Sequence, residues 1–500
     1  MIKRYTDYLD DISESELYEG LLAYGLFAEK LPPVFTAEDF YNYALEMNHK
    51  FGGKNCGYIY FESMRDINIP RMIGVPNPMA YQRLCECLSN NWEEIKEHFH
   101  KQTDKDGHKI SRIHIRKMKG TPALFKMNYK NWKIDDSPIP DLLIGKRYMV
   151  TADISTCFPS MYSHSICWAL VGKEKAKQNK MNKSMWYNKI DQYCMALKNG
   201  ETHGFLIGPH ASNLISEIVL TVVDYELSPN WDYIRNIDDY TCYVETYADA
   251  QRFITDLSSQ LRKFDLILNH NKTKIEELPV ASTKHWVRQL SAFDFSSAYR
   301  KVNYKKVQAF LDIAVGLMYE NGNNAAIINY AIKVLASMTL TNNAKQYCLK
   351  TLLHFAVIYP YLIPLLEEYV IKPFDAEKDI IEDFTQKIYS NALLQENYEA
   401  MSYSIYYSLK YNFSIVQLKC EDAIRMDSCL FKLFVWLYYK RRNDQDALRK
   451  LKEHAKELSK EEFDQYWIFV YEVLPTDDLD DGDWKSIKKA GVSFIKPEFK

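Results

Sequence analysis

The sequence predicts an α+β domain followed by an all-α domain of paired helices. Strand-like runs are confined to the first 285 residues, where they alternate with amphipathic helices. Beyond about Pro279 glycine thins, and only helical patterns separated by short polar turns remain. A chain of 500 residues is too long for one ordinary core, so two or three domains are expected. We therefore expect domains over residues 1–285 and 286–500.

The composition is that of a folded globular protein. Apolar residues make up 47% and charged residues 26%, which is not the balance of a disordered chain. The net charge of -3 excludes a simple basic sheath around nucleic acid, so a polyanion would have to meet a local positive patch. The ten cysteines form no CxxC pair and no signal peptide is present, so we expect reduced thiols and a cytoplasmic protein. The most apolar segment, Thr351–Leu366, predicts a buried helix and no membrane span.

The N-terminal third contains helices, a strand pair and a basic stretch. Residues 1–30 are expected to be helical, and short strands are expected over Tyr58–Phe61 and Ile67–Val75. From Lys96 to Lys133 basic residues meet few acids, and Tyr129 and Trp132 are interleaved with them. This composition suits a channel that follows a sugar-phosphate backbone, and it suits a solvated basic loop equally well.

The central region carries the elements that organise the chain. An apolar strand is expected over Tyr148–Asp153, and a flexible turn at Gly204–Pro209 opens a strongly amphipathic helix. The run Tyr233–Val244 then predicts a hairpin with Asp238 and Asp239 at its tip. A helix over 248–264 and a polar turn over 269–274 complete the region.

The C-terminal half predicts an α-solenoid of degenerate repeats. No repeat motif in it is strict enough to name. The clearest helical patterns cover Val307–Tyr319, Ala325–Thr339, Lys345–Val357 and Asp446–Leu458.

Asp153, Asp238 and Asp239 form the candidate catalytic group. A carboxylate at a strand end can meet a pair at a hairpin tip if the strands are neighbours in one sheet. Carboxylates held so close repel unless a cation lies among them. Two Mg²⁺ ions could activate a hydroxyl and neutralise a departing pyrophosphate, with Mn²⁺ as an alternative metal. By residue type alone, a capped strand beside an acidic turn explains these residues better.

The surrounding motifs favour the catalytic interpretation. Asp153-Ile-Ser-Thr-Cys-Phe158, Gly204-Phe-Leu-Ile-Gly-Pro-His-Ala-Ser212 and Ile237-Asp-Asp-Tyr240 resemble motifs A, B and C of a reverse-transcriptase palm, in order and spacing. Arg235 before the doublet matches the bacterial branch, and Lys272-Thr-Lys274 resembles the motif D region. Upstream, the segment from Arg71 to Tyr81 resembles the fingers segment whose arginine contacts the incoming triphosphate.

This resemblance implies roles for individual residues. Asp153 and Asp238 would bind metal together with the Ile154 carbonyl, and Asp239 would complete the acidic cluster. Phe158 would exclude a 2′-hydroxyl and so favour deoxynucleotides. The nucleotide would also contact three further residues, Arg71, Gly208 and Lys272.

Within the reverse transcriptases, the chain resembles the bacterial abortive-infection (AbiK-like) group. The resemblance rests on Tyr24-Gly25, on His164-Ser-Ile-Cys-Trp168, on Lys173-Glu-Lys-Ala-Lys-Gln178 and on Thr202-His-Gly204. It is strong to about residue 285 and weaker beyond, where this group carries a HEAT-like helical domain in place of a thumb.

The resemblance implies an untemplated polymerase that is primed by its own protein and acts in defence against phage. A tyrosine hydroxyl would attack the first dNTP, so that single-stranded DNA grows covalently attached to the chain. Tyr24 is the first candidate primer and Tyr8 the second. The group also implies a homo-oligomer and no membrane partner.

The chain departs from ordinary reverse transcriptases in motif B, where Ile207 replaces a glutamine that usually contacts the template side. A clear thumb signature and a ribonuclease H segment are missing. One alternative is a conventional RNA-templated reverse transcriptase of a retron-like defence system. Another is a non-enzymatic helical-repeat protein with a relic palm.

Overall fold

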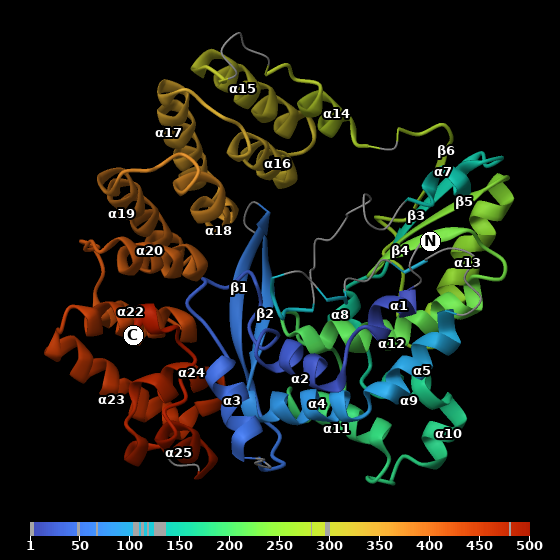
Figure 1. The fold of residues 1–500 in the computed structure, drawn as a ribbon, viewed down its shortest axis with the longest axis horizontal. Helices are drawn as coiled ribbons and strands as arrows, with labels where there is room; N and C mark the ends of the chain where they lie inside the picture. Colours follow the sequence, from blue (N-terminus) through green and yellow to red (C-terminus); the bar gives the residue numbers. More distant parts are fainter. Residues whose placement is uncertain are drawn as a thin grey trace.

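The structure is a computed structural model of the whole chain. It describes residues 5–47, 51–66, 69–103, 110–111, 115–117, 120–124, 137–281, 283–295, 301–479 and 482–500. Most of the basic stretch, including Tyr129 and Trp132, lies outside these residues. The described part is mixed α and β: its strands all precede residue 278, and helices alone follow (Figure 1).

A four-stranded antiparallel sheet forms the palm-like centre. Its strands lie in the order β4-β5-β3-β6, with bounds β3 (Tyr148–Asp153), β4 (Tyr233–Asn236), β5 (Asp239–Val244) and β6 (Lys274–Glu277). The prediction for β3 is confirmed in its bounds. The predicted hairpin also forms, but its tip differs by one residue. Asn236 pairs with Asp239, so Ile237 and Asp238 make the turn and Asp239 already belongs to β5.

The strand pair predicted upstream forms a separate two-stranded hairpin, β1 (Tyr58–Asp66) and β2 (Ile69–Pro76). β1 is longer than predicted because the alternation of buried side chains continues from Ile59 and Phe61 to the polar Ser63. Arg71 lies within β2, opposite Ser63.

Helices surround these two sheets. Those of the N-terminal half are α1 (Tyr5–Asp10), α2 (Glu14–Leu22), α3 (Glu38–Met47), α4 (Pro78–Asn90), α5 (Trp92–Thr103), α7 (Ile139–Leu143), α8 (Cys157–Ser160), α9 (Ser165–Val171), α10 (Lys173–Gln178), α11 (Trp186–Ala196), α12 (His210–Leu227) and α13 (Tyr247–Arg262). The amphipathic α12 is almost entirely buried, and α13 packs against β3 and β5.

The C-terminal half is a series of helices that pack consecutively on one another. They are α14 (His285–Ser291), α15 (Tyr304–Glu320), α16 (Ala325–Ala336), α17 (Asn342–Ile358), α18 (Ile363–Leu366), α19 (Lys378–Gln395), α20 (Tyr398–Tyr411), α21 (Cys420–Arg425), α22 (Cys429–Arg441), α23 (Gln445–Glu461), α24 (Phe463–Val473) and α25 (Gly482–Lys489). The four helices predicted there are confirmed as α15, α16, α17 and α23.

The single helix predicted over Thr351–Leu366 is wrong. α17 ends at Ile358 because Pro360 has no N–H to continue the ladder, and a 3₁₀ turn separates it from α18. Among the described helices, none combines the length and the apolar character that crossing a bilayer requires.

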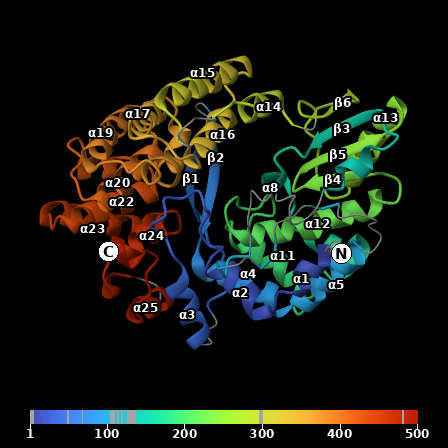
Figure 2. The ribbon, with the colours of Figure 1, turned by 45° about the horizontal axis from the view of Figure 1, so that its top comes forward.

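The helical series returns to the N-terminal segment. Figures 1 and 2 show it running from α14 and α15 round to α25, beside α3 and the β1–β2 hairpin. Phe35 bridges Ile495, and backbone hydrogen bonds join Thr36 to Phe494 at 3.0 Å and Lys496 to Val34 at 2.9 Å. One hydrophobic core runs through both halves as a result, and β1 of the hairpin packs against α20, α22 and α24 of the C-terminal half.

Candidate active site

Two neighbouring strands bring the three predicted aspartates to one edge of the sheet. Asp153, the last residue of β3, lies directly opposite Asp239 in the antiparallel ladder. The N–H of Ile154 donates to the Asp238 carbonyl at 3.0 Å, which fixes the turn against β3. Asp153 is buried, Asp238 is half-buried and Asp239 is exposed. The exposure of the three carboxylates therefore increases from Asp153 to Asp239.

Burial and the charges of neighbouring carboxylates raise the pKa values of Asp238 and Asp239. Burial raises the pKa of Asp238, and the Asp153 charge adds to the increase. Asp239 reaches solvent on one side, yet partial loss of water raises its pKa to about 6, with Asp238 as the next cause. A cation that neutralised the group would remove this destabilisation.

Cationic side chains approach the group from two sides. Lys272 Nζ lies 2.6 Å from Asp153 Oδ2, and Asn269 Nδ2 donates to the other Asp153 oxygen at 3.2 Å. From the hairpin side comes Arg71. Burial and the Arg65 guanidinium lower the pKa of Arg71, whereas the Asp238 carboxylate acts in the opposite direction. The Arg71 guanidinium is thus close enough to Asp238 to interact with its charge.

Lys30 and Arg65 extend the positive charge around Arg71. Lys30 is exposed on one side, but the surrounding protein removes enough water to lower its pKa, and Arg71 lowers it further. Reasoning from the sequence missed both residues. The only signal for Arg65 is its place near the tip of the hairpin that carries Arg71.

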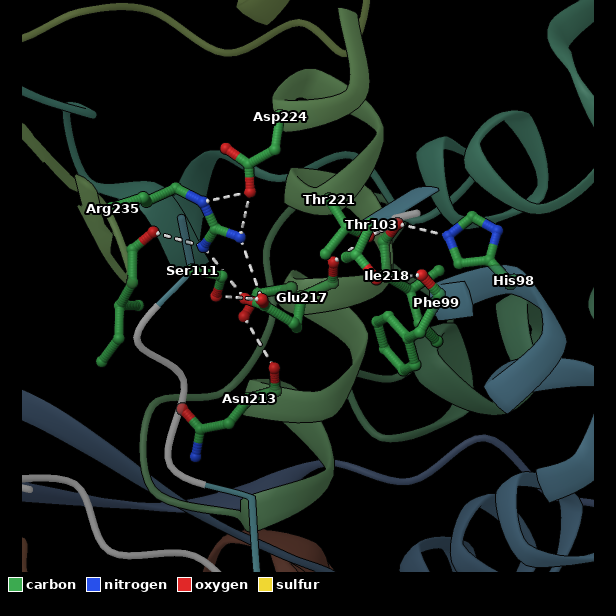
Figure 3. A network of polar contacts seen from close by, with 12 residues as sticks. His98, Phe99, Thr103, Ser111, Asn213, Glu217, Ile218, Thr221, Asp224 and Arg235 are labelled. Carbon is green, nitrogen blue, oxygen red and sulfur yellow. Dashed lines mark hydrogen bonds and ion pairs between the residues drawn. The ribbon is translucent and has the colours of Figure 1, made fainter. Parts of the chain in front are cut away.

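A buried ionic network lies beneath the aspartate turn, and Figure 3 shows its arginine between two acids of α12. Arg235 is fully buried and makes five donor contacts. Its Nε and Nη2 reach Asp224 Oδ2 at 2.8 and 2.6 Å, and Nη1 and Nη2 reach the two Glu217 oxygens at 2.9 Å. Nη1 also donates to the Ile237 carbonyl at 3.0 Å. All five N–H groups of the guanidinium can therefore be satisfied.

Two neutral side chains also donate hydrogen bonds to the acids of this network. The acids in turn keep the arginine charged. Ser111 Oγ donates to Glu217 at 2.5 Å, and the Tyr233 hydroxyl donates to Asp224 at 2.9 Å. Burial alone would lower the pKa of Arg235, but Asp224 and Glu217 outweigh it and raise the pKa well above its usual value. Arg235 therefore stays charged although it is fully buried.

This network holds an unusual backbone conformation. Ile237 has φ of 58°, a left-handed value that is rare for a β-branched residue. Its carbonyl is fixed by Arg235 from below, and the next carbonyl, that of Asp238, is fixed by Ile154. The sequence indicated Arg235 but not its partners. Glu217 and Asp224, two turns apart on a largely apolar helix, were the available signal.

Motif B packs tightly against both the palm and the hairpin. Phe158, in α8, is partly buried, and its carbonyl accepts the Phe205 N–H at 2.8 Å. A side chain at Gly204 would place its Cβ 2.6 Å from the Pro159 carbonyl. Gly208 has φ of 130° and lies against Ile73 in β2. These positions therefore require glycine.

The two candidate priming tyrosines lie in N-terminal segments. The Tyr24 hydroxyl donates to Glu38 at 2.6 Å, and burial, then this bond, raises its pKa. The Arg116 guanidinium lies 4.3 Å from the Tyr8 ring centroid. Neither contact tests a priming role, which stays a prediction.

The donor set at the aspartates fits a hard divalent cation. Within the described ranges, no three His, Cys, Asp or Glu side chains are grouped so that they could hold a metal ion. The predicted ligands are fewer, namely the Asp153 and Asp238 carboxylates and the Ile154 carbonyl. Mg²⁺ commonly binds one or two protein carboxylates and takes its other ligands from water and substrate phosphates. The Lys272 ammonium beside Asp153 shows that this carboxylate accepts a cation.

No protein-family model and no curated protein matches this chain. Telomerases are among the solved structures with coarse similarity to this chain. Apo telomerase from Candida tropicalis truncated from its C-terminal domain has 15% identity over 48% of this chain and 55% of that chain, at a TM-score of 0.29. The apo telomerase from Candida tropicalis has 12% identity over 83% and 73%, at 0.33. Telomerase from Candida albicans in complex with a TWJ fragment of telomeric RNA has 11% identity over 87% and 70%, at 0.30. Because these TM-scores are low, we base the function on the geometry of the site.

Proposed function

We propose that this chain is a protein-primed, template-independent DNA polymerase with a reverse-transcriptase fold, acting in abortive-infection defence against phage. The observation that carries the proposal is the meeting of Asp153 with Asp238 and Asp239 at one sheet edge, within electrostatic reach of Arg71 in the β1–β2 hairpin. In this proposal residues 1–285 form the polymerase domain and residues 286–500 form a HEAT-like helical domain. The protein would act as a homo-oligomer.

The chemistry is nucleotidyl transfer from a dNTP. Asp153, Asp238 and the Ile154 carbonyl would hold Mg²⁺, or Mn²⁺. When bound, the metal would activate the attacking hydroxyl and neutralise the leaving pyrophosphate. Arg71, with Lys30 and Arg65 beside it, would bind the triphosphate.

Two further residues complete the nucleotide site. The Phe158 ring would lie under the sugar and exclude a 2′-hydroxyl. The absence of a side chain at Gly208 would let the backbone approach the nucleotide. Lys272 would neutralise the pyrophosphate or give it a proton.

The contact between Tyr24 and Glu38 supports self-priming. A phenol is a weak nucleophile until a base takes its proton, and the Glu38 carboxylate accepts the Tyr24 O–H at 2.6 Å. If Tyr24 is the primer, Glu38 would accept its proton in the first transfer, in which the tyrosine oxygen bonds to the α-phosphorus and pyrophosphate leaves.

Motif B supports synthesis without a template. Ile207 has no side-chain polar group to offer a template base, and its carbonyl is occupied by the Gly74 N–H at 2.9 Å. The alternative function is RNA-templated synthesis, as in a retron-like system. It predicts no incorporation until an RNA template is added.

A labelling experiment tests the proposal. Purified protein is incubated with Mg²⁺ and labelled dNTPs, without template or primer, and is then denatured. Label that stays with the protein supports self-primed synthesis, whereas no incorporation without a template contradicts it. Tyr24→Phe and Tyr8→Phe identify the primer, and Asp238→Asn is the inactive control. Full phage protection by Asp238→Asn in cells would favour a non-enzymatic role instead.

A further inference from the structure

Backbone hydrogen bonds join the segment after Phe158, which would contact the nucleotide, to residues 202–205 at the start of motif B. The segment after Phe158 runs beside residues 202–205, with backbone bonds from Phe205 to Phe158 at 2.8 Å and from Gly204 to Met161 at 2.9 Å. Ser163 donates to Thr202 at 2.8 Å, and His164 follows. An extended chain advances about 3.3 Å per residue, so His164 lies within about 20 Å of Phe158 along this segment.

His164 is oriented by a buried carboxylate. Its Nδ1 lies 2.5 Å from Asp191 Oδ2, while Asp191 is only 8% exposed. The second Asp191 oxygen is buried and has no hydrogen-bond partner in the described part of the chain. The Asp191 carboxylate therefore fixes the orientation of the His164 ring.

Aromatic rings surround this histidine. The Tyr162 ring lies 4.7 Å from the His164 ring and 5.6 Å from that of Trp168, and all three residues are partly exposed. Lys173 Nζ lies 3.9 Å from the Trp168 ring centroid. Rings combined with cations in this way are typical of surfaces on which nucleic-acid bases stack.

The helix that follows is strongly basic and its charge is not neutralised. Exposed lysines occur at five positions on α10 and the turn after it, and Glu174 is the one acid among them: Lys173, Lys175, Lys177, Lys180 and Lys183. None of the five forms a salt bridge with a described residue. By contrast, Lys450 on α23 lies 2.8 Å from Glu421, and Lys456 lies 3.0 Å from Asp478.

We infer that Tyr162, His164, Trp168 and the lysines of α10 form a binding surface for single-stranded DNA. We call these residues the α10 surface; Figure 1 shows α9 and α10 at the edge of the molecule, away from the C-terminal helices. The lysines bind phosphates, and the rings of Tyr162, His164 and Trp168 stack on bases. That the strand is the enzyme's own product rests on the proposed function; the binding itself does not.

Binding is tested on the inactive Asp238→Asn chain, which separates it from synthesis. The probe is a 5′-fluorescent oligothymidylate, whose anisotropy is measured from low to moderate salt. Replacing Lys173, Lys175 and Lys177 by Gln is expected to weaken binding at least about tenfold and to lower the salt slope by about 2, or 0.7 for each lost phosphate contact. Trp168→Ala is expected to weaken binding while leaving the slope unchanged.

The matched control replaces Lys450, Lys452 and Lys456 of α23 by Gln, which removes the same charge from a surface where lysines are paired. Equal losses in both triple variants, or unchanged binding in the α10 variant, would overturn the inference. Tighter binding of an oligouridylate would overturn the assignment to DNA.

In the active chain, the α10 variant should shorten the products but retain addition of the first nucleotide. If no template-free product forms at all, the proposed function fails, and the binding measurement still decides the inference.

Discussion

Two groups of charge lie on opposite sides of the turn at Ile237 and Asp238, and they are built in opposite ways. Beneath it, Arg235, Glu217 and Asp224 are almost completely buried, and every guanidinium donor has an acceptor. Above it, the three aspartates range from buried to exposed, and the pKa values of Asp238 and Asp239 are raised. The lower group is complete within the protein, whereas Lys272 and Arg71 compensate the upper group only in part, since the pKa values of Asp238 and Asp239 stay raised.

This difference separates a structural role from a ligand-binding role. A buried ion pair is held together because removing one partner leaves the other uncompensated. Carboxylates that destabilise one another in the free protein are instead stabilised by a ligand that supplies positive charge. The same turn therefore joins a rigid support to an open site, and substitutions on its two sides should have different effects.

The largest expected effect is the loss of activity in Asp238→Asn. Removing this carboxylate takes away a metal ligand, so template-free labelling should fall at least about a thousandfold, or about 4 kcal/mol in the barrier. Stability should stay unchanged or rise slightly, because Asp238 is ionised next to Asp153 at a cost. Parallel labelling and urea denaturation check both results, with the exposed Asp312→Asn as control. A large loss of stability in Asp238→Asn would contradict the comparison.

The reverse pattern is expected for Arg235→Met. Methionine fills much of the space but leaves Glu217 and Asp224 buried without a cation, which should cost about 3–5 kcal/mol of unfolding free energy. Adding Glu217→Gln and Asp224→Asn to the same chain should recover most of this loss. Arg252→Met is the control, since its side chain is 66% exposed. Denaturant midpoints measure the series, and a stability of Arg235→Met close to that of the control would refute the supporting role.

The sequence was sufficient for the elements whose pattern is local. β3, α12 and the paired C-terminal helices follow from periodicity, and the hairpin follows from its strand formers around two acids. β1 was predicted too short because Ser63 continues the buried face with a polar residue. The pattern over Lys345–Val357 predicted the end of α17 within one residue, whereas the helix predicted over Thr351–Leu366 ran past it, since the apolar run hid the break at Pro360.

Less of the site could be predicted, because the residues that contact one another in it come from distant segments of the chain. Motif positions identified the aspartates, Arg71, Phe158 and Lys272. Nothing in the sequence gives the distance from Arg235 to Glu217, or from Arg71 to Lys30. Such contacts depend on how helices and strands pack, which a single sequence without homologues does not reveal.

A further carboxylate, that of Glu399 in α20, sharpens the comparison because it is buried without an arginine partner. It accepts the Met64 N–H of β1 at 2.7 Å and is 2% exposed, and burial raises its pKa to about 7. Between about pH 4.5 and 7 the folded chain keeps a proton that the unfolded chain has released. Stability should therefore fall as the pH rises through this window, by at most about 3 kcal/mol. Denaturation at pH 5 and pH 8, values on either side of the pKa of about 7, measures the fall. Glu399→Gln should remove the share of this fall that comes from Glu399 and leave the share of Asp238 and Asp239, whose pKa values are also raised, whereas Glu320→Gln on the surface should leave the whole fall unchanged.

The smallest effect on stability, with a clear effect on activity, is expected at Lys272. Its side chain is 53% exposed, so the pair with Asp153 should contribute less than about 1 kcal/mol to folding. Lys272→Met should nevertheless lower labelling about 10- to 100-fold, because neutralisation or protonation of the pyrophosphate is lost. Lys272→Arg separates the two roles. Arginine keeps the charge but does not release a proton, so it should restore activity if the charge is what matters. If Lys272→Met changed stability more than activity, Lys272 would belong with Arg235 as a support of the fold, and not with the open site above the turn.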